Sequence, residues 1–241
     1  MDQSDFRSEC IKCGLIFSRY RPPEEREMSY PPPREPLPSL PVRFIRYMLH
    51  TNDRIKPVYF TGRLLVLIFI AAWSVSFLQS SLESNYAGSS FMHLVNLPFH
   101  EAGHILFSPL GGVMQSLGGS LGQLIMPVTC MLVLLVKTRD TFGASMALWW
   151  TGESLLDMAP YINDAVAMRL HLLGGNTGAG APYGFHDWNY ILSELDMLSS
   201  HGTIARLAEA GGKALMGLAI LWGLMVLIRQ MRRLRRTTVK V

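Results

Sequence analysis

Charged side chains are scarce in this chain. Asp, Glu, Lys and Arg make up 17% of its 241 residues, whereas apolar and aromatic residues make up 49%. The mean hydropathy is +0.21, and several apolar runs are long enough to enter a bilayer. In soluble domains, charged residues usually make up about a quarter of the chain. The shortage therefore excludes an ordinary soluble domain and indicates an integral membrane protein with polar ends.

Cysteine is also rare, which excludes a disulfide framework. Cys10 and Cys13 form a C-x-x-C pair, while Cys130 lies alone in an apolar run. With Gly14 permitting a tight turn, the pair predicts a zinc knuckle, and a tetrahedral zinc site then needs two more ligands. These would come from another chain, through a partner or self-association, or from a distant residue such as His50. The alternative is a free dithiol.

The N-terminus lacks the apolar stretch of a cleavable signal peptide, so the first spanning helix is expected to act as its own insertion signal. A basic surface typical of nucleic-acid binding is missing as well. The Lys and Arg residues behind the net charge of +4 collect in the two polar ends. They are expected to report membrane topology, with the lipid bilayer as partner and no nucleic acid.

Changes in composition divide the chain into four predicted segments. They are a knuckle over residues 1–21, a linker over 22–58, a membrane domain over 59–229 and a basic tail over 230–241. Between Pro22 and Pro41 the chain has eight prolines, a composition that favours an extended linker. Residues 42–58 are basic and aromatic, which predicts either an anchor along the lipid headgroups or a simple stop before the first span.

The predicted fold class is all-α, a polytopic transmembrane helical bundle. The first span, Leu64 to Leu78, is followed by a loop without Lys or Arg, which places the N-terminus in the cytoplasm and this loop outside. Further apolar segments cover residues 124–136, 142–159 and 214–228. Five arginines follow the last of them between positions 229 and 236, a pattern typical of a cytoplasmic stop.

An H-E-x-x-H motif lies in an apolar segment between these spans. His100 and His104 are four residues apart, so on a helix they project from one face at the spacing that allows two imidazoles to share a metal ion. Glu101 lies beside them and is placed to act as a base on a water at the metal. Ionisable side chains are expensive at membrane depth and mark function there. The motif therefore predicts a zinc-dependent hydrolase site.

The motif helix is predicted to run from Leu97 to Ser108, with Asn96 as its N-cap and Pro98 in its first turn, unless residues 90–96 extend it through a proline kink. Such a helix is about 18 Å long, much shorter than the roughly 30 Å hydrocarbon core. If all five apolar segments crossed, the C-terminal arginines would lie outside. A re-entrant motif helix removes this conflict and places both termini in the cytoplasm. The alternative is that another segment, such as 142–159, does not cross.

A glycine-rich stretch follows the motif from Gly111 to Gly122. Glycine permits close approach of two backbones, so the stretch predicts either tight helix packing or contact with an extended peptide. A catalytic zinc usually has three protein ligands, and the third must be sought further along the chain. The candidates are Glu153, Asp157, Asp164, His186 and Asp187.

The motif, the glycine-rich stretch and a later Leu-Leu, Pro and Asp pattern over residues 155–164 resemble the site-2 protease family of intramembrane zinc metalloproteases. The resemblance covers roughly residues 64–228. In that family two motif histidines and a distant aspartate hold zinc, and the motif glutamate is the base. The resemblance implies that His100 and His104 are zinc ligands and that Glu101 is the catalytic residue.

The resemblance also implies an aspartate as third ligand. Asp164 is the predicted ligand, with Asp157 as its rival, because Asp164 precedes Ala165 where the family pattern has glycine. No segment resembles the PDZ module that some family members carry. Three further residues are expected to orient the ligands or to belong to a lid over the site: Glu153, His186 and Asp187.

The sequence thus predicts a zinc-dependent peptidase that hydrolyses peptide bonds of a membrane protein or peptide within or near the bilayer. A bacterial-type inner membrane with both termini cytoplasmic is the expected location. The alternative hypotheses are a non-proteolytic membrane zinc-binding or scaffold protein that retains the motif, and a membrane zinc hydrolase with another substrate.

Overall fold

The computed structural model describes residues 8–10, 12–19, 37–51, 56–173 and 175–238. These residues form α-helices and short helical turns and contain no β-strand, which confirms the predicted all-α class. The α-helices are α1 (Leu40–Met48), α2 (Pro57–Gln79), α3 (Phe91–Phe107), α4 (Gly112–Leu132), α5 (Thr141–Asn163), α6 (Asp187–Glu194) and α7 (His201–Thr238). The short turns are Phe17–Arg19, Leu82–Ser84, Ser108–Leu110, the π-helical Val133–Lys137, Gly178–Gly180 and Leu198–Ser200.

The chain divides into two units, residues 1–43 and 44–241. In the first unit, a small hairpin pairs Glu9 with Ile16 and turns at Gly14, whose φ of 69° is in the left-handed region that glycine tolerates. The Cys10 carbonyl accepts the Gly14 N–H across this turn at 2.7 Å. Residues 22–36 of the predicted proline-rich linker lie outside the described residues.

Three helical segments of the second unit are long and apolar enough to cross a membrane: Pro57–Gln79, Gly112–Lys137 and Leu198–Arg236. Only 17% of the most apolar stretch of α2 is buried within the protein. Side chains such as Leu65 and Phe69 are 62% and 63% exposed, which water would not favour. This apolar exterior is the surface of an integral membrane protein.

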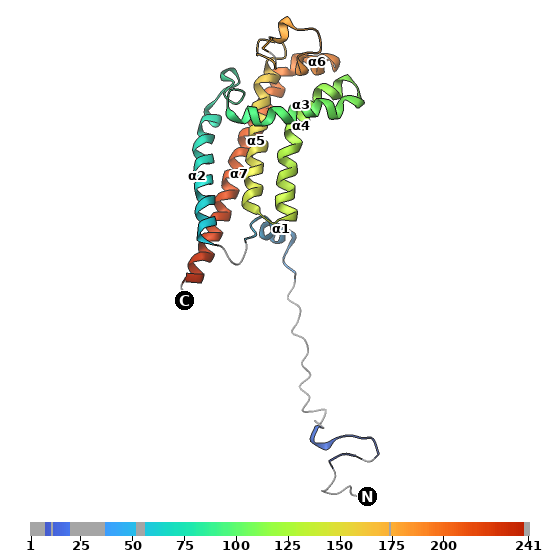
Figure 1. Cartoon of the computed structure of the whole chain (residues 1–241), viewed down its shortest axis with the longest axis vertical. Coiled ribbons are helices and arrows are strands. Elements are labelled where there is room, and N and C mark those ends of the chain that lie inside the picture. The colour runs from blue at the N-terminus through green and yellow to red at the C-terminus, as the bar shows by residue number, and fades with distance from the viewer. Residues whose placement is uncertain (1–7, 11, 20–36, 52–55, 174, 239–241) are drawn as a thin grey trace. The chain divides into compact units, whose positions relative to one another are not determined.

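Helix α5 has the length of a span but a different composition. It contains Glu153 and Asp157, and sixteen of its 23 residues are buried. Figure 1 shows α5 running beside α7, and backbone contact between Gly152 and Gly212 brings the two helices close together. Because the polar residues of α5 face other helices, α5 can lie among apolar helices without exposing them to lipid.

One end of the bundle is held together by main-chain carbonyls of residues 48–51. The Trp222 indole donates to the Met48 carbonyl at 2.7 Å, and the Thr141 hydroxyl donates to the His50 carbonyl at 2.7 Å. At the same end the Arg63 guanidinium pairs with Asp140 at 3.0 Å. The starts of α2 and α5 and the C-terminal part of α7 therefore meet here.

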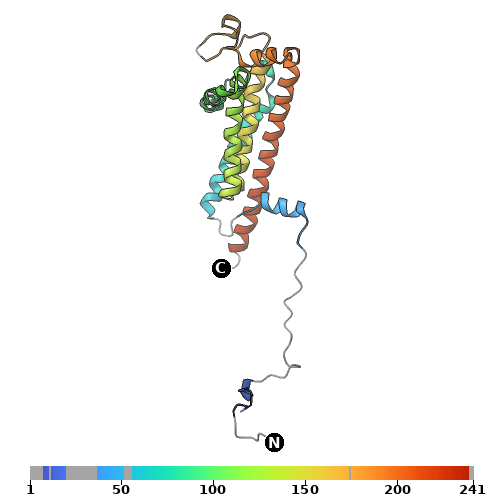
Figure 2. The same cartoon turned by 90° about the vertical axis from the view of Figure 1, so that its right-hand side faces the viewer.

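The motif helix α3 lies across the other helices instead of along them. In Figure 1 α2, α5 and α7 run up the page while α3 crosses near their upper ends, and Figure 2 shows α3 almost end-on. Helix α3 begins at Phe91 and contains Pro98 in its interior, so the start at Leu97 is wrong and the alternative, an extension by residues 90–96, is observed. Asn96 is not the cap: it is 1% exposed, inside the helix, where buried partners satisfy its amide.

The contact between α5 and α7 gives a first test. A Cβ atom added at Gly152 would lie 2.8 Å from the Gly212 carbonyl oxygen and 2.9 Å from the Met216 nitrogen, both backbone atoms that cannot turn aside. We expect Gly152→Ala to destabilise the detergent-solubilised protein by about 1–3 kcal/mol, as overpacking does. Thermal unfolding measures this change.

Gly217→Ala in α7 is the matched control, because nothing lies within 4 Å of a Cβ at that position. It is expected to leave the melting temperature unchanged or to raise it slightly, since alanine favours a helix over glycine. Equal melting temperatures for the two variants would contradict the close packing of α5 on α7.

Candidate metal centre

Two histidines of α3 and one aspartate of α6 converge at one point. Nε2 of His100 lies 3.3 Å from Oδ2 of Asp187, and Nε2 of His104 lies 3.4 Å from the same oxygen. The two imidazole rings are nearly perpendicular, with centroids 4.7 Å apart. Among the described residues this is the group of three donors, all within 4.8 Å of one another, that could hold a metal ion.

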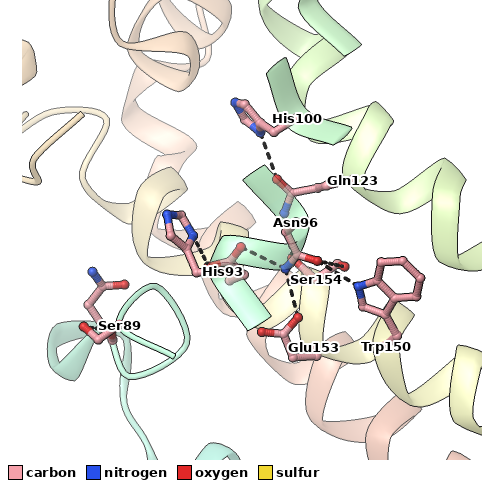
Figure 3. A network of polar contacts seen from close by, with 10 residues as sticks. Ser89, His93, Asn96, His100, Gln123, Trp150, Glu153 and Ser154 are labelled. Carbon is pink, nitrogen blue, oxygen red and sulfur yellow. Dashed lines mark hydrogen bonds and ion pairs between the residues drawn. The ribbon is translucent and has the colours of Figure 1, made fainter. Parts of the chain in front are cut away.

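The other ring nitrogen of each histidine is fixed by α4. Nδ1 of His100 lies 2.8 Å from Oε1 of Gln123 (Figure 3), and Nδ1 of His104 lies 2.8 Å from the Gln115 carbonyl oxygen. The Gln123 amide donates in turn to the Ser154 carbonyl at 3.2 Å, which directs its oxygen towards His100. Because both acceptors are carbonyl-type oxygens, each Nδ1 carries the hydrogen. Nε2 of each ring is then the nitrogen that can bind a metal.

Asp187 is held in place by Tyr161 at the end of α5. The Tyr161 hydroxyl accepts the Asp187 main-chain N–H at 3.0 Å and donates to Oδ2 at 3.3 Å. Burial alone would raise the pKa of Asp187, but hydrogen bonds from His100 and His104 lower it below its ordinary value. The hydrogen bond to Asp187 raises the pKa of His104 to about 9. Carboxylate and imidazoles thus compensate one another's charge.

The glycine-rich stretch forms the surface of α4 on which α3 packs. A Cβ at Gly103 would meet the Gly118 carbonyl, and a Cβ at Gly122 would meet the Phe99 carbonyl. Of the two predicted uses of this stretch, tight helix packing is therefore observed. Gly119 lies directly beneath the imidazoles, since a Cβ there would be 2.5 Å from His100 Nε2 and 2.6 Å from His104 Cε1.

A cavity of about 680 Å³ opens beside the two histidines. Glu101 lines it, so the motif carboxylate and the converging histidines share one space. The size is typical of a site for a small molecule or a short peptide segment. Six of the remaining lining residues are apolar: Leu97, Met158, Leu170, Leu172, Leu173 and Phe185.

The structure does not bring the predicted third ligand to the histidines. The Asp164 carboxylate accepts the main-chain N–H groups of Arg169 and Leu170 at 3.0 and 2.8 Å. It also lies 3.5 Å from Nε2 of His186, a buried ring whose pKa is lowered by burial. Asp164 therefore anchors the loop that leads to α6. Asp187, one of five candidates from the sequence, occupies the place predicted for Asp164.

The rival ligand Asp157 and the predicted supporting residue Glu153 belong to a polar cluster that reaches the cavity through Asp157. The Asn96 amide donates to Glu153 Oε2 at 2.9 Å and to Asp157 Oδ2 at 3.0 Å. Nδ1 of His93 lies 2.9 Å from Asp157 Oδ1. Figure 3 shows Asn96 between His93, Glu153 and Trp150, whose indole donates to the Asn96 oxygen at 2.8 Å. These contacts tie α3 to α5.

The cysteine pair of the first unit remains half a metal site. Backbone N–H groups of Cys13 and Lys12 donate to Cys10 and lower the pKa of its thiol. Such donors stabilise a thiolate, as a zinc knuckle requires. Among the residues described there, no third histidine, cysteine or carboxylate joins the pair. Zinc binding at Cys10 and Cys13 stays a prediction.

Three residues of this region were not predicted from the sequence. Gln123 directly follows the glycine-rich stretch, of which only the glycines were considered, and Tyr161 gives no sequence signal of its contact with Asp187. His93 did carry a signal, because it precedes His100 by seven residues and therefore lies on the same helix face. The periodicity of histidine along α3 would have identified it.

Comparisons with known proteins find no family model, no curated protein and no solved structure that matches this chain. The chemistry of the site is therefore judged from its own donors. Two imidazole nitrogens with fixed tautomers and one carboxylate oxygen form a donor set that transition metals bind in proteins. Gly119 leaves the space that these side chains need. The residues present fit a metal ion.

Gly119 provides a test of this centre. We expect Gly119→Ala to abolish metal binding, because the added methyl group overlaps both imidazoles and must displace them from Asp187. Bound metal in the purified protein is measured by mass spectrometry. Gly62→Ala is the control, since a Cβ there has nothing within 4 Å and metal content should stay at the wild-type level. Full metal content in Gly119→Ala would show that the ion binds elsewhere.

The two aspartates provide a second test. Asp187→Ala removes a donor from the centre and is expected to weaken metal binding by at least about a hundredfold. Loss of a residue that only orients a metal ligand already lowers affinity by up to about this factor. Asp164→Ala loosens the loop before α6 and is expected to weaken it less. Competition with a chelator measures both affinities. The reverse order would return the ligand role to Asp164, as the sequence predicted.

Proposed function

We propose that this protein is a zinc-dependent membrane peptidase in which His100, His104 and Asp187 hold the metal and Glu101 is the catalytic base. The observation that supports this most directly is the convergence of both Nε2 atoms on one carboxylate oxygen. The Nδ1 atoms are meanwhile fixed by α4. Glu101 lines the same cavity, which suits a hydrolytic site.

Zinc is the ion that we propose for this donor set. Two histidines and one carboxylate are the ligand set of several catalytic zinc sites, which leave a fourth position for water or substrate. When bound, zinc would supply acidity to a coordinated water and polarise a substrate carbonyl. The residues around the centre then orient the ligands: Gln123 and the Gln115 carbonyl hold the imidazoles, and Tyr161 holds Asp187.

Hydrolysis adds water across the peptide C–N bond. The water oxygen joins the carbonyl carbon while Glu101 takes one of its protons. As the C–N bond breaks, Glu101 gives this proton to the leaving nitrogen, which departs as an amine. The carboxylate is thereby restored for the next cycle.

Charge distribution supports a topology with both termini in the cytoplasm. Arg63, Lys137 and Arg229 lie at the end of the bundle where residues 48–51 are anchored, and basic residues favour the cytoplasmic face. Four crossing helices, α2, α4, α5 and α7, give an even number and return the chain to this side. The candidate centre at α3 then faces the non-cytoplasmic half of the membrane, as in a bacterial-type inner membrane.

The substrate class follows from the same surroundings. The centre lies next to helices whose outer faces are apolar, and six apolar side chains line its cavity beside the polar ones. A membrane protein, or a peptide that lies at the bilayer surface, fits such an entrance better than a charged soluble peptide.

Two variants test the proposed chemistry. Glu101→Gln keeps the size of the side chain but removes the base, so cleavage of membrane peptides should fall by about a hundredfold or more while zinc content is unchanged. His100→Ala should lose both zinc and cleavage. The assay measures peptide cleavage in detergent or vesicles together with zinc content.

Glu194→Gln is the control for the glutamate substitution. Glu194 lies at the end of α6, where it accepts a hydrogen bond from Tyr183, and it does not line the cavity. Its cleavage rate should equal that of the wild type. If zinc binds but neither wild type nor Glu194→Gln cleaves any peptide, the protein is a zinc-binding membrane protein without peptidase activity.

A further inference from the structure

A histidine–aspartate pair lies in the same cavity as the candidate centre. Both His93 of α3 and Asp157 of α5 line the cavity, and Nδ1 of His93 is 2.9 Å from Asp157 Oδ1. The His93 side chain is 41% exposed, whereas that of Asp157 is 4% exposed. The ring therefore presents its outer edge to the cavity while its inner edge is fixed by a buried carboxylate.

The pair is supported from behind. The Asn96 amide donates to the second oxygen of Asp157 and to Glu153, and both carboxyl groups are buried. Glu153 Oε1 has no hydrogen-bond partner among the described residues. If the cluster only stabilised the packing of α3 on α5, the hydrogen bonds of Asn96 would be enough. Here the structure also keeps a second buried acid beside the carboxylate that orients His93.

The position of His93 relative to the histidine pair follows from helix geometry. Seven residues separate His93 from His100, which is close to two turns, so both project from the same face about 10 Å apart along the axis. Nε2 of His93 has no partner among the described residues and faces the space that a substrate would fill. An extended peptide advances roughly 3.3–3.6 Å per residue, so three residues cover this distance.

We propose that His93, oriented by Asp157, is a positioning residue that binds a main-chain amide of an extended peptide three residues from the bond at the metal centre. This inference rests on the proposed peptidase function and adds a subsite to it. A peptide amide offers both an N–H and a carbonyl oxygen, so it satisfies Nε2 whether that nitrogen accepts or donates. Leu97, which lies between His93 and His100 on α3, also lines the cavity and offers an apolar contact.

Length-matched inhibitors test the subsite. The probes are leucine peptides of one to four residues that carry a zinc-binding hydroxamate group. One series carries the group at one end of the peptide and the other series at the opposite end. The two series therefore extend from the metal along the cavity in opposite peptide directions. Their dissociation constants are measured on the zinc-loaded full chain in detergent. In one of the two series, we expect the gain in affinity on adding the third residue to be about fivefold larger than the gain on adding any other residue. This factor is the size of one net hydrogen bond.

His93→Ala should remove this step and leave zinc content near the wild type, with a lower melting temperature because the buried Asp157 loses a hydrogen bond. His171→Ala is the matched control, because His171 lines the same cavity from the loop before α6 and should keep the step. A smooth rise with length in the wild type, or a step that survives His93→Ala, would overturn the subsite while leaving the peptidase intact. Absence of any zinc-dependent hydroxamate binding would instead overturn the proposed function and the subsite together.

Discussion

The close approach of α3 to α4 is the contact on which the candidate centre depends. Glycines at positions 103, 118 and 122 bring the two backbones into contact, so that no side chain separates the helices. At this distance the imidazoles of His100 and His104 reach carbonyl oxygens of α4 and turn their free nitrogens outward. A larger residue along this contact would move α4 away and release both rings. The geometry of the centre is therefore set by residues that carry no functional group.

Helix α5 resolves a conflict between apolar surroundings and polar chemistry. Glu153 and Asp157 would be unfavourable against lipid, and α5 is not among the described helices that qualify as spans by length and composition. The structure covers them with α3, whose Asn96 and His93 supply hydrogen bonds. Because α3 lies across the bundle, one polar face of α5 is shielded, and the same contact fixes α3 in the position that the centre requires.

Local features of the site could be predicted from the sequence, whereas long-range ones could not. The spacing of His100 and His104 needs only one helical turn, and the apolar runs identify α2, α4 and α7. The helix start near Phe91 was only the alternative prediction, because Pro98 and Asn96 suit a first turn when tertiary contacts are unknown. Asp187 was a candidate but was passed over, since its meeting with the histidines depends on how α4 and α5 fold back. The pattern around Asp164 had pointed to that aspartate, which serves the loop instead.

The order of the donors along the chain has a consequence for biosynthesis. His100 and His104 leave the ribosome together, but Asp187 follows only after α4 and α5 have been made. Tyr161 and Asp164, which hold Asp187 and its loop, lie at or just after the end of α5. The three donors can thus come together only once α4 and α5 have been made. The last long helix, α7, still follows the third donor, so a chain that ends before α6 carries the motif histidines without the carboxylate that they face.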